Sequence, residues 1–341
     1  MIRPANVADI WALRRKAQRR IYFYNDALLA SSYHSYILSL RSIIDPMSSD
    51  RQTLVLRDHG VRGYLQTCRR SHTAATDLQF LGSFNRRARS RLSDGDVFFQ
   101  LLEEYLKRAG NDQIERVFAT LGARSADVIE VLRQLGFHPY AQQSVWMLSE
   151  PIIEAGSSMV ALRRQARRDA WGIQQLYTSL TPRHVQQAEP RESTSWILSR
   201  RQQWFRGAER CWVLGDDQSL TVHIHLRTGS RGHVLRIMVA PHLRADTTAM
   251  VRYVLSQLHD QRPVFAVLRG YQSELRASFE ELGFVERGEQ TSFVKHLAIL
   301  KRQPAFLPTL LGKAPGEGAL PVSIITNYNG TWRQHERTDC Y

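Results

Sequence analysis

The sequence predicts a mixed α/β (α+β) protein with two tandem domains, each a curved mixed β-sheet flanked by helices. The chain has 341 residues, which is too long for one ordinary core and fits about two domains of common size. Segments with strand and helix patterns alternate along it, as in mixed α/β proteins. A pattern also recurs after roughly 150 residues, a spacing that suits tandem domains rather than a solenoid.

The repeat is clearest where each copy ends. The segment "DVIEVLRQLGFHPYAQQSVWML" resembles "ELRASFEELGFVERGEQTSFVKHL" when Gly136 is placed on Gly283. The alignment also pairs Leu135 with Leu282, Phe137 with Phe284, Gln143 with Gln290, Ser144 with Thr291 and Trp146 with Phe293. A glycine after a helix favours a left-handed C-terminus, and the next phenylalanine is expected to fold back onto the core.

The beginnings of the two copies match as well. The segment "IRPANVADIWAL" resembles "LRRQARRDAWGI", which sets Asp9 over Asp169 and Trp11 over Trp171. In both copies an extended segment with arginine leads into a helix whose first turn carries aspartate, a residue that helix N-termini favour. Elsewhere, tryptophans are expected to pack in cores or domain faces, among them Trp171, Trp196, Trp204 and Trp212.

The elements expected within each copy follow the same order. In the first copy we expect strands at 52–58, 61–69, 76–83 and 114–122 and a helix at 96–110. In the second we expect strands at 210–216, 219–228, 232–241, 263–270 and 291–297 and helices at 247–260 and 273–284. The helix at 247–260 has an apolar side made of Met250, Val251, Val254, Leu255 and Leu258.

The boundary between the domains is expected in 149–160, where proline, glycine and serine interrupt the pattern. We therefore predict an N-terminal domain at 1–150, a C-terminal domain at 160–300 and an extended tail at 301–341. Prolines and glycines exclude regular structure over much of the tail. Its apolar pieces, such as "AFLPTLL", are expected to dock onto the body or onto a partner.

The composition is basic, with a net charge of +14. Of 46 lysines and arginines five are lysine, so 41 are arginine, whose planar fork suits phosphate. A basic surface favours anionic partners such as nucleotides, CoA-like molecules or nucleic acid, although genome composition or heat adaptation produces the same bias. Nucleic-acid binding rests on charge alone and is not the preferred interpretation.

Three separated cysteines and no CxxC pair argue against a zinc site or disulfide framework, so no metal is expected. The N-terminus lacks the apolar core of a signal peptide, and no apolar run reaches the length of a membrane span. A cytoplasmic protein without a membrane partner is expected.

A strand, loop and helix in the second copy, "VAPHLRADTTAMVRYVLSQL", carry the resemblance to a known family. Together with the order of elements, this segment resembles the GNAT N-acetyltransferase fold, twice over, across about 1–148 and 160–298. The resemblance implies acetyl-CoA as co-substrate. It also implies a loop of the form Arg/Gln-x-x-Gly-x-Gly/Ala, whose consecutive N–H groups bind the CoA diphosphate at the start of a helix.

Carried onto this chain, Arg244 matches the first position of that loop, Thr247 the first glycine and Ala249 the last position. The Cβ of Thr247 restricts the approach of backbone to phosphate, and Asp246 adds a carboxylate nearby. The residues expected to bind the co-substrate are Met238, Val239, Arg244, Ala245, Thr247, Thr248 and Ala249. In the first copy the corresponding loop carries Arg86, Arg87, Arg89 and Arg91, which either clamp phosphates or lie in a solvated loop.

The family often places a tyrosine four residues before the glycine of "GF" to protonate the leaving thiolate. Phe279 and, in the first copy, Leu132 stand there, and neither donates a proton. The candidate base is His225, which shares a strand face with His223; such pairs are also common surface residues.

The segment 181–192 falls where the family places contacts to the acceptor. Its Arg183, His184, Glu189 and Glu192 could select an amine, although a polar loop between helices has the same composition.

The preferred hypothesis is an acyl-CoA-dependent N-acetyltransferase that acts on an amine of a small molecule or peptide. The alternative is a non-catalytic GNAT-like regulatory or binding protein that has lost the catalytic residues. The sequence specifies neither the acceptor nor the oligomeric state.

Overall fold

The computed structural model describes residues 1–14, 17, 19–31, 50–58, 60–70, 73–84, 93–151, 161–198, 209–217 and 219–298. These residues belong to one compact unit, Met1–Ile299. We call 1–151 the N-terminal half and 161–298 the C-terminal half. The predicted tail, most of the predicted linker and the four arginines of the first-copy loop lie outside the described residues.

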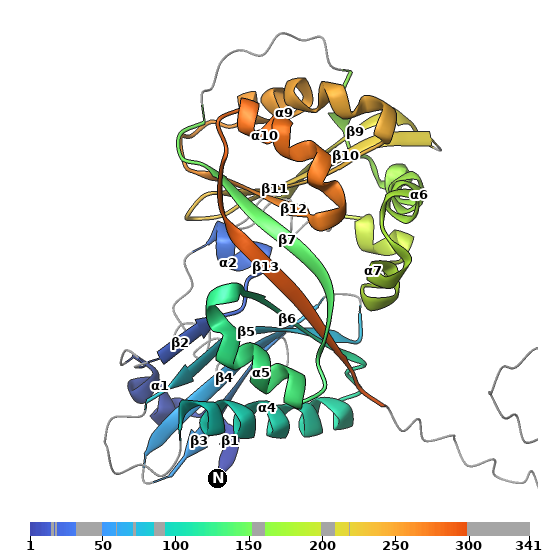
Figure 1. The fold of residues 1–341 in the computed structure, drawn as a ribbon. Coiled ribbons are helices and arrows are strands. Elements are labelled where there is room, and N and C mark those ends of the chain that lie inside the picture. The colour runs from blue at the N-terminus through green and yellow to red at the C-terminus, as the bar shows by residue number, and fades with distance from the viewer. Residues whose placement is uncertain are drawn as a thin grey trace, which may run out of the picture. The chain divides into compact units, whose positions relative to one another are not determined.

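The two halves contain corresponding elements (Figure 1). The N-terminal half holds β1 (Ile2–Pro4), α1 (Val7–Arg14), β2 (Arg19–Tyr22), α2 (Asp26–Ala30), β3 (Arg51–Arg57), β4 (Val61–Arg69), β5 (Ala75–Ser83), α4 (Asp94–Asn111), β6 (Arg116–Gly122), α5 (Ala126–Gln134) and β7 (His138–Leu148). The C-terminal half holds β8 (Arg163–Arg164), α6 (Ala170–Leu180), α7 (Arg183–Ala188), η3 (Ser193–Trp196), β9 (Glu209–Asp216), β10 (Ser219–Thr228), β11 (His233–Val239), η4 (Pro241–Asp246), α9 (Thr247–Ser256), β12 (Val264–Arg269), η5 (Gly270–Leu275), α10 (Arg276–Glu281) and β13 (Val285–His296).

One mixed sheet runs through both halves in the order β1-β3-β4-β5-β6-β13-β7-β12-β11-β10-β9-β8, and β2 pairs with β5. The pairs β5–β6 and β11–β12 are parallel, and the remaining pairs are antiparallel. The sequence predicts the order strand, helix, a variable helical stretch, strands, helix, strand, helix, strand in each copy. Both halves follow it, and the N-terminal half adds β2 between α1 and α2. The predicted fold class is confirmed: the protein is mixed α/β, with two successive sets of strands and flanking helices on a mixed sheet.

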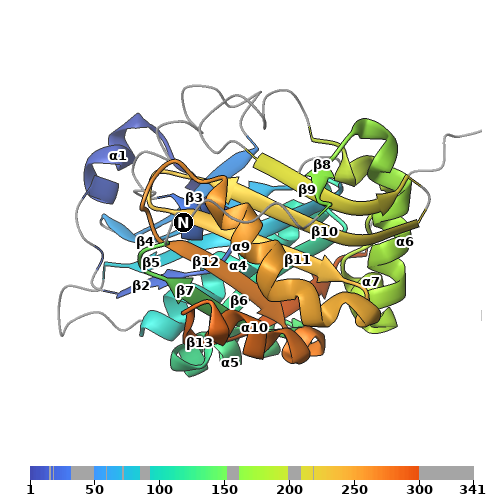
Figure 2. The same cartoon turned by 90° about the horizontal axis from the view of Figure 1, so that it is seen from above.

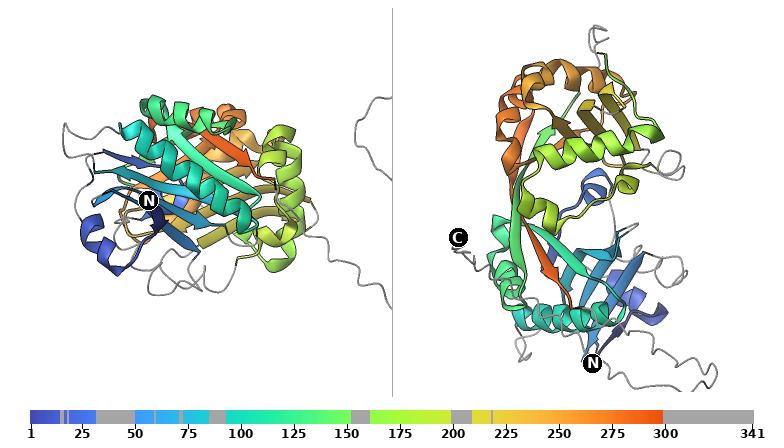
Figure 3. Two further views of the ribbon diagram at one scale, coloured as in Figure 1. Left: turned by 90° about the horizontal axis from the view of Figure 1, so that it is seen from below. Right: turned by 90° about the vertical axis from the view of Figure 1, so that its right-hand side faces the viewer.

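The last strand of each half pairs with the sheet of the other half. β7 and β13 lie side by side, as Figures 1 and 3 show. β7 then pairs with β12, and β13 pairs with β6. Phe293 of β13 accordingly packs in the N-terminal core, while Trp146 and Leu148 of β7 pack in the C-terminal core. The predicted boundary at 149–160 stays a prediction, and the sheet is continuous between the halves.

The internal repeat is visible where the two exchanged strands cross. Gln143 and Gln290, which the sequence alignment pairs, face each other in register, and Gln143 Nε2 donates to Gln290 Oε1 at 2.8 Å. The beginnings of the copies correspond equally well. Asp9 and Asp169 are buried at the starts of their helices, and each accepts two hydrogen bonds from the arginine six residues earlier.

Both helix-ending glycines adopt the left-handed conformation that the sequence predicts. Gly136 has φ +76° and Gly283 has φ +83°. The N–H groups of Phe137 and Phe284 close each turn on the carbonyl five residues earlier, at 2.9 and 3.0 Å, as in a Schellman motif. Both phenylalanine side chains are buried, so the predicted corner is confirmed.

The tryptophan prediction is wrong for two residues that the structure describes, Trp11, which is 75% exposed, and Trp171. Trp212 is buried and Trp196 is half-buried, whereas Trp171 is 53% exposed. Trp171 lies on the solvent side of α6, because the neighbouring Ala170 and Gly172 occupy the side that packs on the sheet. Trp204 lies outside the described residues.

Within each half, helices lie on both faces of the sheet (Figure 2). In the C-terminal half the apolar side of α9 is buried as predicted, against Val222, Ile224 and Leu226 of β10. Since alternate residues of a strand point to opposite faces, His223 and His225 point to the other face, where α6 and η3 lie. This alternation places both histidines at the candidate site.

Gly283→Ala tests the left-handed corner. We expect a loss of about 1 kcal/mol, because the left-handed cost of about 1–2 kcal/mol for a residue with Cβ exceeds the gain of about 0.4–1 kcal/mol from a less flexible unfolded chain. The control is Gly110→Ala inside α4, where an added Cβ meets nothing within 4 Å and stability should rise slightly. Urea unfolding measures the stability of both variants. Equal changes in their free energies of unfolding would contradict the left-handed conformation of Gly283.

Candidate functional site

Each half contains a pair of parallel strands that diverge along their length. We call the space between the diverging strands the wedge of that half. β5 and β6 pair only through Ala75–Asp77 and Arg116–Phe118. β11 and β12 pair only through His233–Leu235 and Val264–Ala266. Beyond these positions the backbones diverge, and something else must satisfy their hydrogen bonds and fill the space.

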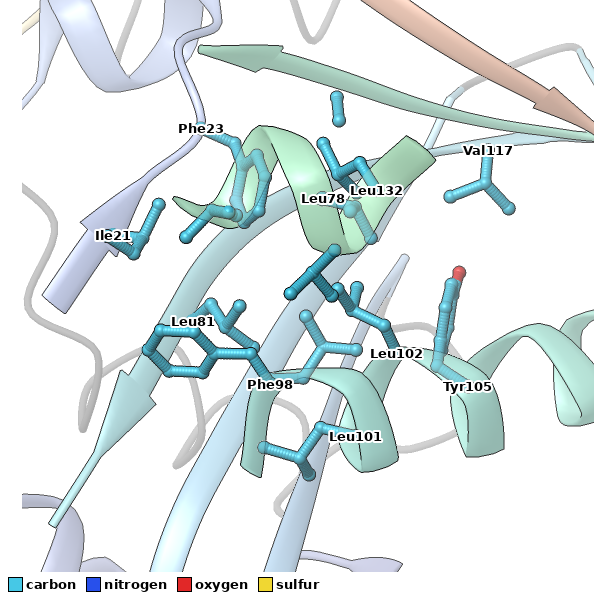
Figure 4. Close-up of a cluster of buried hydrophobic side chains, with 14 of the residues drawn as sticks. Ile21, Phe23, Leu78, Leu81, Phe98, Leu101, Leu102, Tyr105, Val117 and Leu132 are labelled. Atoms are coloured by element: carbon cyan, nitrogen blue, oxygen red, sulfur yellow. The ribbon is translucent and has the colours of Figure 1, made fainter. Parts of the chain in front are cut away.

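The wedge of the N-terminal half is filled by the chain itself. β2 pairs with the second part of β5. The next two residues then bridge the diverging strands, since Phe23 N–H donates to Gln79 O at 3.0 Å and Tyr24 N–H donates to Thr120 O at 2.9 Å. The Phe23 side chain is fully buried among the residues of the N-terminal core (Figure 4). A ligand could enter this wedge only by displacing β2 and Phe23.

The wedge of the C-terminal half contains a small cavity of about 160 Å³. Ile237 and Met238 line it from β11, and Val267 and Arg269 line it from β12. The carboxamide of Gln272 bridges the two strands: Nε2 donates to Ile237 O at 2.6 Å, and Oε1 accepts from Arg269 N–H at 3.0 Å. One side chain thus satisfies both diverging strands and leaves space next to Met238.

His223 forms part of the wall of this small cavity and is neutral at working pH. It is buried, its Nε2 lies 3.3 Å from Gln165 Oε1, and its ring packs edge-on against Trp196. Burial and the neighbouring positive groups lower its pKa to about 3. His223 therefore supplies shape and one hydrogen bond rather than charge.

A larger cavity of about 880 Å³ lies between the two halves and is lined by residues of both. Its walls are strongly polar, with arginines and carboxylates from β3, β4, β5, β6, β9, β10, β11 and β12. Seven residues line both cavities: Glu189, Arg191, Ser195, Glu209, His225, Arg236 and Arg269. The two cavities therefore share a wall, and this shared wall is where groups held in each could meet.

His225 and Glu209 form a pair on the shared wall. His225 Nε2 lies 3.2 Å from Glu209 Oε2. Burial alone would raise the pKa of Glu209, but the hydrogen bond from His225 and the charges of His225 and Arg227 outweigh it and lower that pKa. An ionised carboxylate only accepts hydrogen bonds, so the nitrogen of His225 that faces it, Nε2, carries a hydrogen.

Of the two carboxylates on the shared wall, Glu189 has more hydrogen-bonding and ion-pair partners than Glu209. Arg269 Nη2 donates to Glu189 Oε1 at 2.7 Å, the Tyr140 hydroxyl donates to the same oxygen, and Arg191 lies 3.5 Å from Oε2. Burial alone would raise the pKa of Glu189, but Arg269 and Arg191 hold it well below its ordinary range. This network joins α7 to the strands of both halves, because Tyr140 belongs to β7 and Arg269 to β12.

A second ion pair connects the halves beside the histidine. Asp26, at the start of α2, accepts hydrogen bonds from Arg236 Nε at 2.6 Å and Nη2 at 2.8 Å. Arg236 is the register partner of His225 in the β10–β11 pair. The charges of Arg236 and Arg227 lower the pKa of Asp26 against the effect of burial. The N-terminal half thus contacts β11, the strand that pairs with β10 at the candidate base.

The predicted diphosphate segment forms helical turns. η4 leads directly into α9, with Leu243 N–H donating to Ala240 O at 3.0 Å and Thr247 N–H donating to Arg244 O. Arg244 forms an ion pair with Glu274. Of the predicted donors, the Thr247 N–H is therefore already paired with a carbonyl of the same segment, and the Arg244 side chain is paired with a carboxylate.

The two threonines of that segment are buried rather than presented to solvent. Thr248 Oγ1 donates to Glu281 at 2.9 Å, and the Thr247 hydroxyl is buried with no partner among the described residues. Ala245 and Ala249 are exposed. Val239 packs in the C-terminal core. Of the predicted co-substrate residues, only Met238 lines either of the two adjoining cavities, together with the predicted base His225.

The predicted acceptor segment reaches the cavities through Glu189, Pro190 and Arg191, so only one of its four candidate residues lines them. Glu189 lines both, whereas Arg183, His184 and Glu192 are exposed on or after α7. Phe279 and Leu132, at the family's tyrosine position, are fully buried in the two cores. The sequence analysis missed Glu209, Arg236, Arg269, Gln272, Tyr140 and Asp26. Charged residues at alternate positions of otherwise apolar strands were the available signal for three of them, Glu209, Arg236 and Arg269.

Among the residues that the structure describes, no group of three or more histidine, cysteine or acidic side chains is placed to bind a metal ion. The helices of the same residues are too short or too polar to cross a lipid bilayer.

No protein-family model matches the chain, and no curated protein matches its sequence. Several solved structures are similar to it. A tandem GNAT protein from the clavulanic acid biosynthesis pathway is 14% identical, covers 88% of this chain and 99% of its own, and has a TM-score of 0.48. A GCN5-related N-acetyltransferase from Sphaerobacter thermophilus is 12% identical, covers 88% and 97%, and has a TM-score of 0.49. Another from Anabaena variabilis is 13% identical, covers 87% and 73%, and has a TM-score of 0.43.

Glu189→Gln tests the shared network. The variant should lose about 3–5 kcal/mol at pH 7, because it leaves buried Arg269 without its counter-charge. A carboxylate whose pKa is lowered on folding stabilises the protein above its unfolded pKa, about 4.3, and loses that contribution as the pH falls below it. The difference between wild type and variant should therefore shrink by about 1.4 kcal/mol per pH unit below about pH 4.

Urea unfolding between pH 3 and 8 measures this difference. The exposed Glu192→Gln is the control and should stay within about 0.5 kcal/mol of wild type. A Glu189→Gln loss that does not change with pH would show that the carboxylate is not the stabilising form.

Proposed function

We propose that the protein is an acyl-CoA-dependent N-acetyltransferase, with the acyl thioester in the small cavity and the acceptor amine in the large one. The observation that carries this proposal is the His225–Glu209 pair on the wall between the two cavities. Acyl transfer to an amine requires a neutral nucleophile, a polarised carbonyl and a proton for the leaving thiolate. The residues around the shared wall can be assigned to these tasks.

His225 is the proposed base. With Nε2–H directed to Glu209, Nδ1 is free to take a proton from the acceptor ammonium. The resulting amine attacks the thioester carbonyl: a C–N bond forms, the C–S bond breaks, the leaving thiolate takes a proton from Tyr271, and the second proton of the nitrogen replaces the one that Tyr271 has given. Glu209 stabilises the imidazolium that forms, as a buried carboxylate does in a catalytic triad.

Tyr271 is the proposed proton donor for the thiolate. The usual tyrosine position is occupied by buried Phe279, so the donor must come from elsewhere. Tyr271 lines the small cavity just after β12. The other cavity phenol, Tyr177, already donates to Glu189 O at 3.3 Å, and burial raises its pKa to about 12. Met238 lies on the strand whose N–H groups, by the GNAT resemblance, would contact the carbonyl.

The asymmetry of the two wedges supports a single acyl site. The N-terminal wedge is occupied by Phe23 and its neighbours, whereas the C-terminal wedge opens onto the small cavity. This division agrees with the predicted degenerate N-terminal domain at 1–150 and co-substrate-binding domain at 160–300. By the resemblance, the CoA diphosphate would lie at the start of α9, near the exposed Ala245 and Ala249.

A second candidate function is a non-catalytic receptor for a small molecule held between the halves. The specific observation that favours it is the state of the diphosphate segment, in which Arg244 is paired with Glu274 and the N–H of Thr247 is bonded within the chain. In that case the large cavity would be the binding site and the small cavity would hold no thioester.

Isothermal titration with acetyl-CoA separates the two candidates. The transferase should bind with a Kd in the micromolar to low millimolar range, the usual range of substrate affinities. It should also show a higher Tm, because a ligand that binds only the folded state stabilises it. If millimolar acetyl-CoA gives no heat of binding and no shift in Tm, the transferase is rejected and the non-catalytic receptor is retained.

His225→Ala tests the chemistry. Removal of the base should lower kcat by roughly 10²–10⁴-fold while leaving acetyl-CoA affinity within about threefold. Release of free CoA from acetyl-CoA in the presence of an amine panel measures the rate. His259→Ala, an exposed histidine beyond α9, is the control and should be indistinguishable from wild type. Equal rates for wild type and His225→Ala would exclude His225 as the base.

A further inference from the structure

The walls of the large cavity carry more positive than negative groups. Eight arginines line it: Arg51, Arg69, Arg70, Arg116, Arg191, Arg227, Arg236 and Arg269. Five carboxylates face them: Asp26, Asp50, Asp77, Glu189 and Glu209. Four of the carboxylates are already paired with arginines of the cavity, as Asp26–Arg236, Asp77–Arg70, Glu189–Arg269 and Glu209–Arg227. The arginines that contribute to this positive excess include Arg51, Arg69 and Arg116, which all belong to the N-terminal half.

These three arginines lie at one end of the N-terminal sheet. Arg51 on β3 is the register partner of Cys68 on β4, which is next to Arg69. Across β5, Asp77 pairs with both Cys68 and Phe118. Arg116 lies two residues before Phe118 on β6, and the alternate positions 116, 118 and 120 all face the cavity. We call Arg51, Arg69, Arg70 and Arg116 the arginine wall.

Arg70 is the member of the arginine wall whose side chain is held in place by its contacts. The Arg70 guanidinium makes a bidentate contact to Asp77, with distances of 2.7–3.1 Å, and stacks over the Phe118 ring at 3.7 Å. A guanidinium held in this way cannot turn toward a new partner without losing both contacts. Arg70 therefore contributes positive charge to the cavity, while Arg69 and Arg116 supply the hydrogen-bond donors.

Buried donors in the same wall lack partners within the described residues. Arg116 Nε and Thr73 Oγ1 are buried without a hydrogen bond, and Arg116 reaches a carboxylate only through Nη1, 3.5 Å from Glu115. A buried unpaired donor costs about 1–3 kcal/mol, so a group that accepts from several of them gains that free energy on binding.

We propose that the arginine wall binds the oxyanion of a small molecule, a phosphate or a carboxylate, through Arg116 and Arg69 with Thr73 as a further donor. The inference rests on the proposed function for its chemistry: the acceptor is an amine that carries such a group, and its nitrogen lies toward His225 across the cavity. The volume of about 880 Å³ suits a small molecule. Guanidinium groups bind phosphate and carboxylate through parallel charge-assisted hydrogen bonds.

Anion binding is tested without any acyl donor, by isothermal titration of the full chain with inorganic phosphate and, separately, with succinate. Wild type should bind at least one of the two, and Arg116→Gln should weaken that binding roughly 10- to 100-fold, the loss expected for charge-assisted hydrogen bonds. Thr73→Val removes only a hydroxyl and should weaken binding about three- to tenfold without unfolding the sheet. Arg133→Gln, on the exposed side of α5, is the matched control and should bind like wild type.

The outcomes separate the source of the anion and the two proposals. Preference for phosphate assigns a phosphorylated amine, and preference for succinate assigns an amino acid-like acceptor. Equal affinity in wild type and in both wall variants, or no binding to folded wild type, would overturn the anion site. Anion binding that depends on Arg116, combined with no binding of acetyl-CoA, would retain the site and reject the transferase. Binding of acetyl-CoA without anion binding would retain the proposed transferase and reject the anion site.

Discussion

The exchange of the last strands is the constraint on which the rest of the structure depends. β7 closes the sheet of the C-terminal half and β13 closes that of the N-terminal half, so neither half can complete its own core. The cross-strand bond from Gln143 to Gln290 lies where the two strands meet. Because the strands fix the halves to each other, residues separated by more than a hundred positions can form one cavity between them. Arg236 and Asp26 are 210 positions apart and make such a contact.

The two copies have then taken different roles. Parallel strands that separate must be bridged, and each copy does so differently: the N-terminal copy inserts the backbone of Phe23 and Tyr24, and the C-terminal copy uses the side chain of Gln272. A side chain occupies less of the wedge than a strand does, which leaves room for the small cavity beside Met238. The duplicated fold thus yields one candidate acyl site and one wall that supports it.

Local patterns in the sequence predicted much of this fold. The glycine and phenylalanine of each "LGF" corner, the aspartates at 9 and 169 and the apolar side of α9 all follow from rules that act within a few residues. The strand exchange did not follow, because β7 and β13 have the same pattern whichever half they join. His225 and Met238 were predicted at the site, but Glu209 and Arg269 were not. The partner of Arg269 lies 80 positions away, and the contact of Glu209 with His225 depends on the pairing of β9 with β10, which the sequence pattern does not specify.

A crystal structure with acetyl-CoA, or with a non-hydrolysable analogue, tests the central claim most directly. The account predicts the acyl group between β11 and β12, in contact with Met238 and Val267, while Phe23 stays buried between β5 and β6. Density for the acyl group in the N-terminal wedge with Phe23 displaced, or a C-terminal wedge that stays closed at saturating ligand, would contradict it.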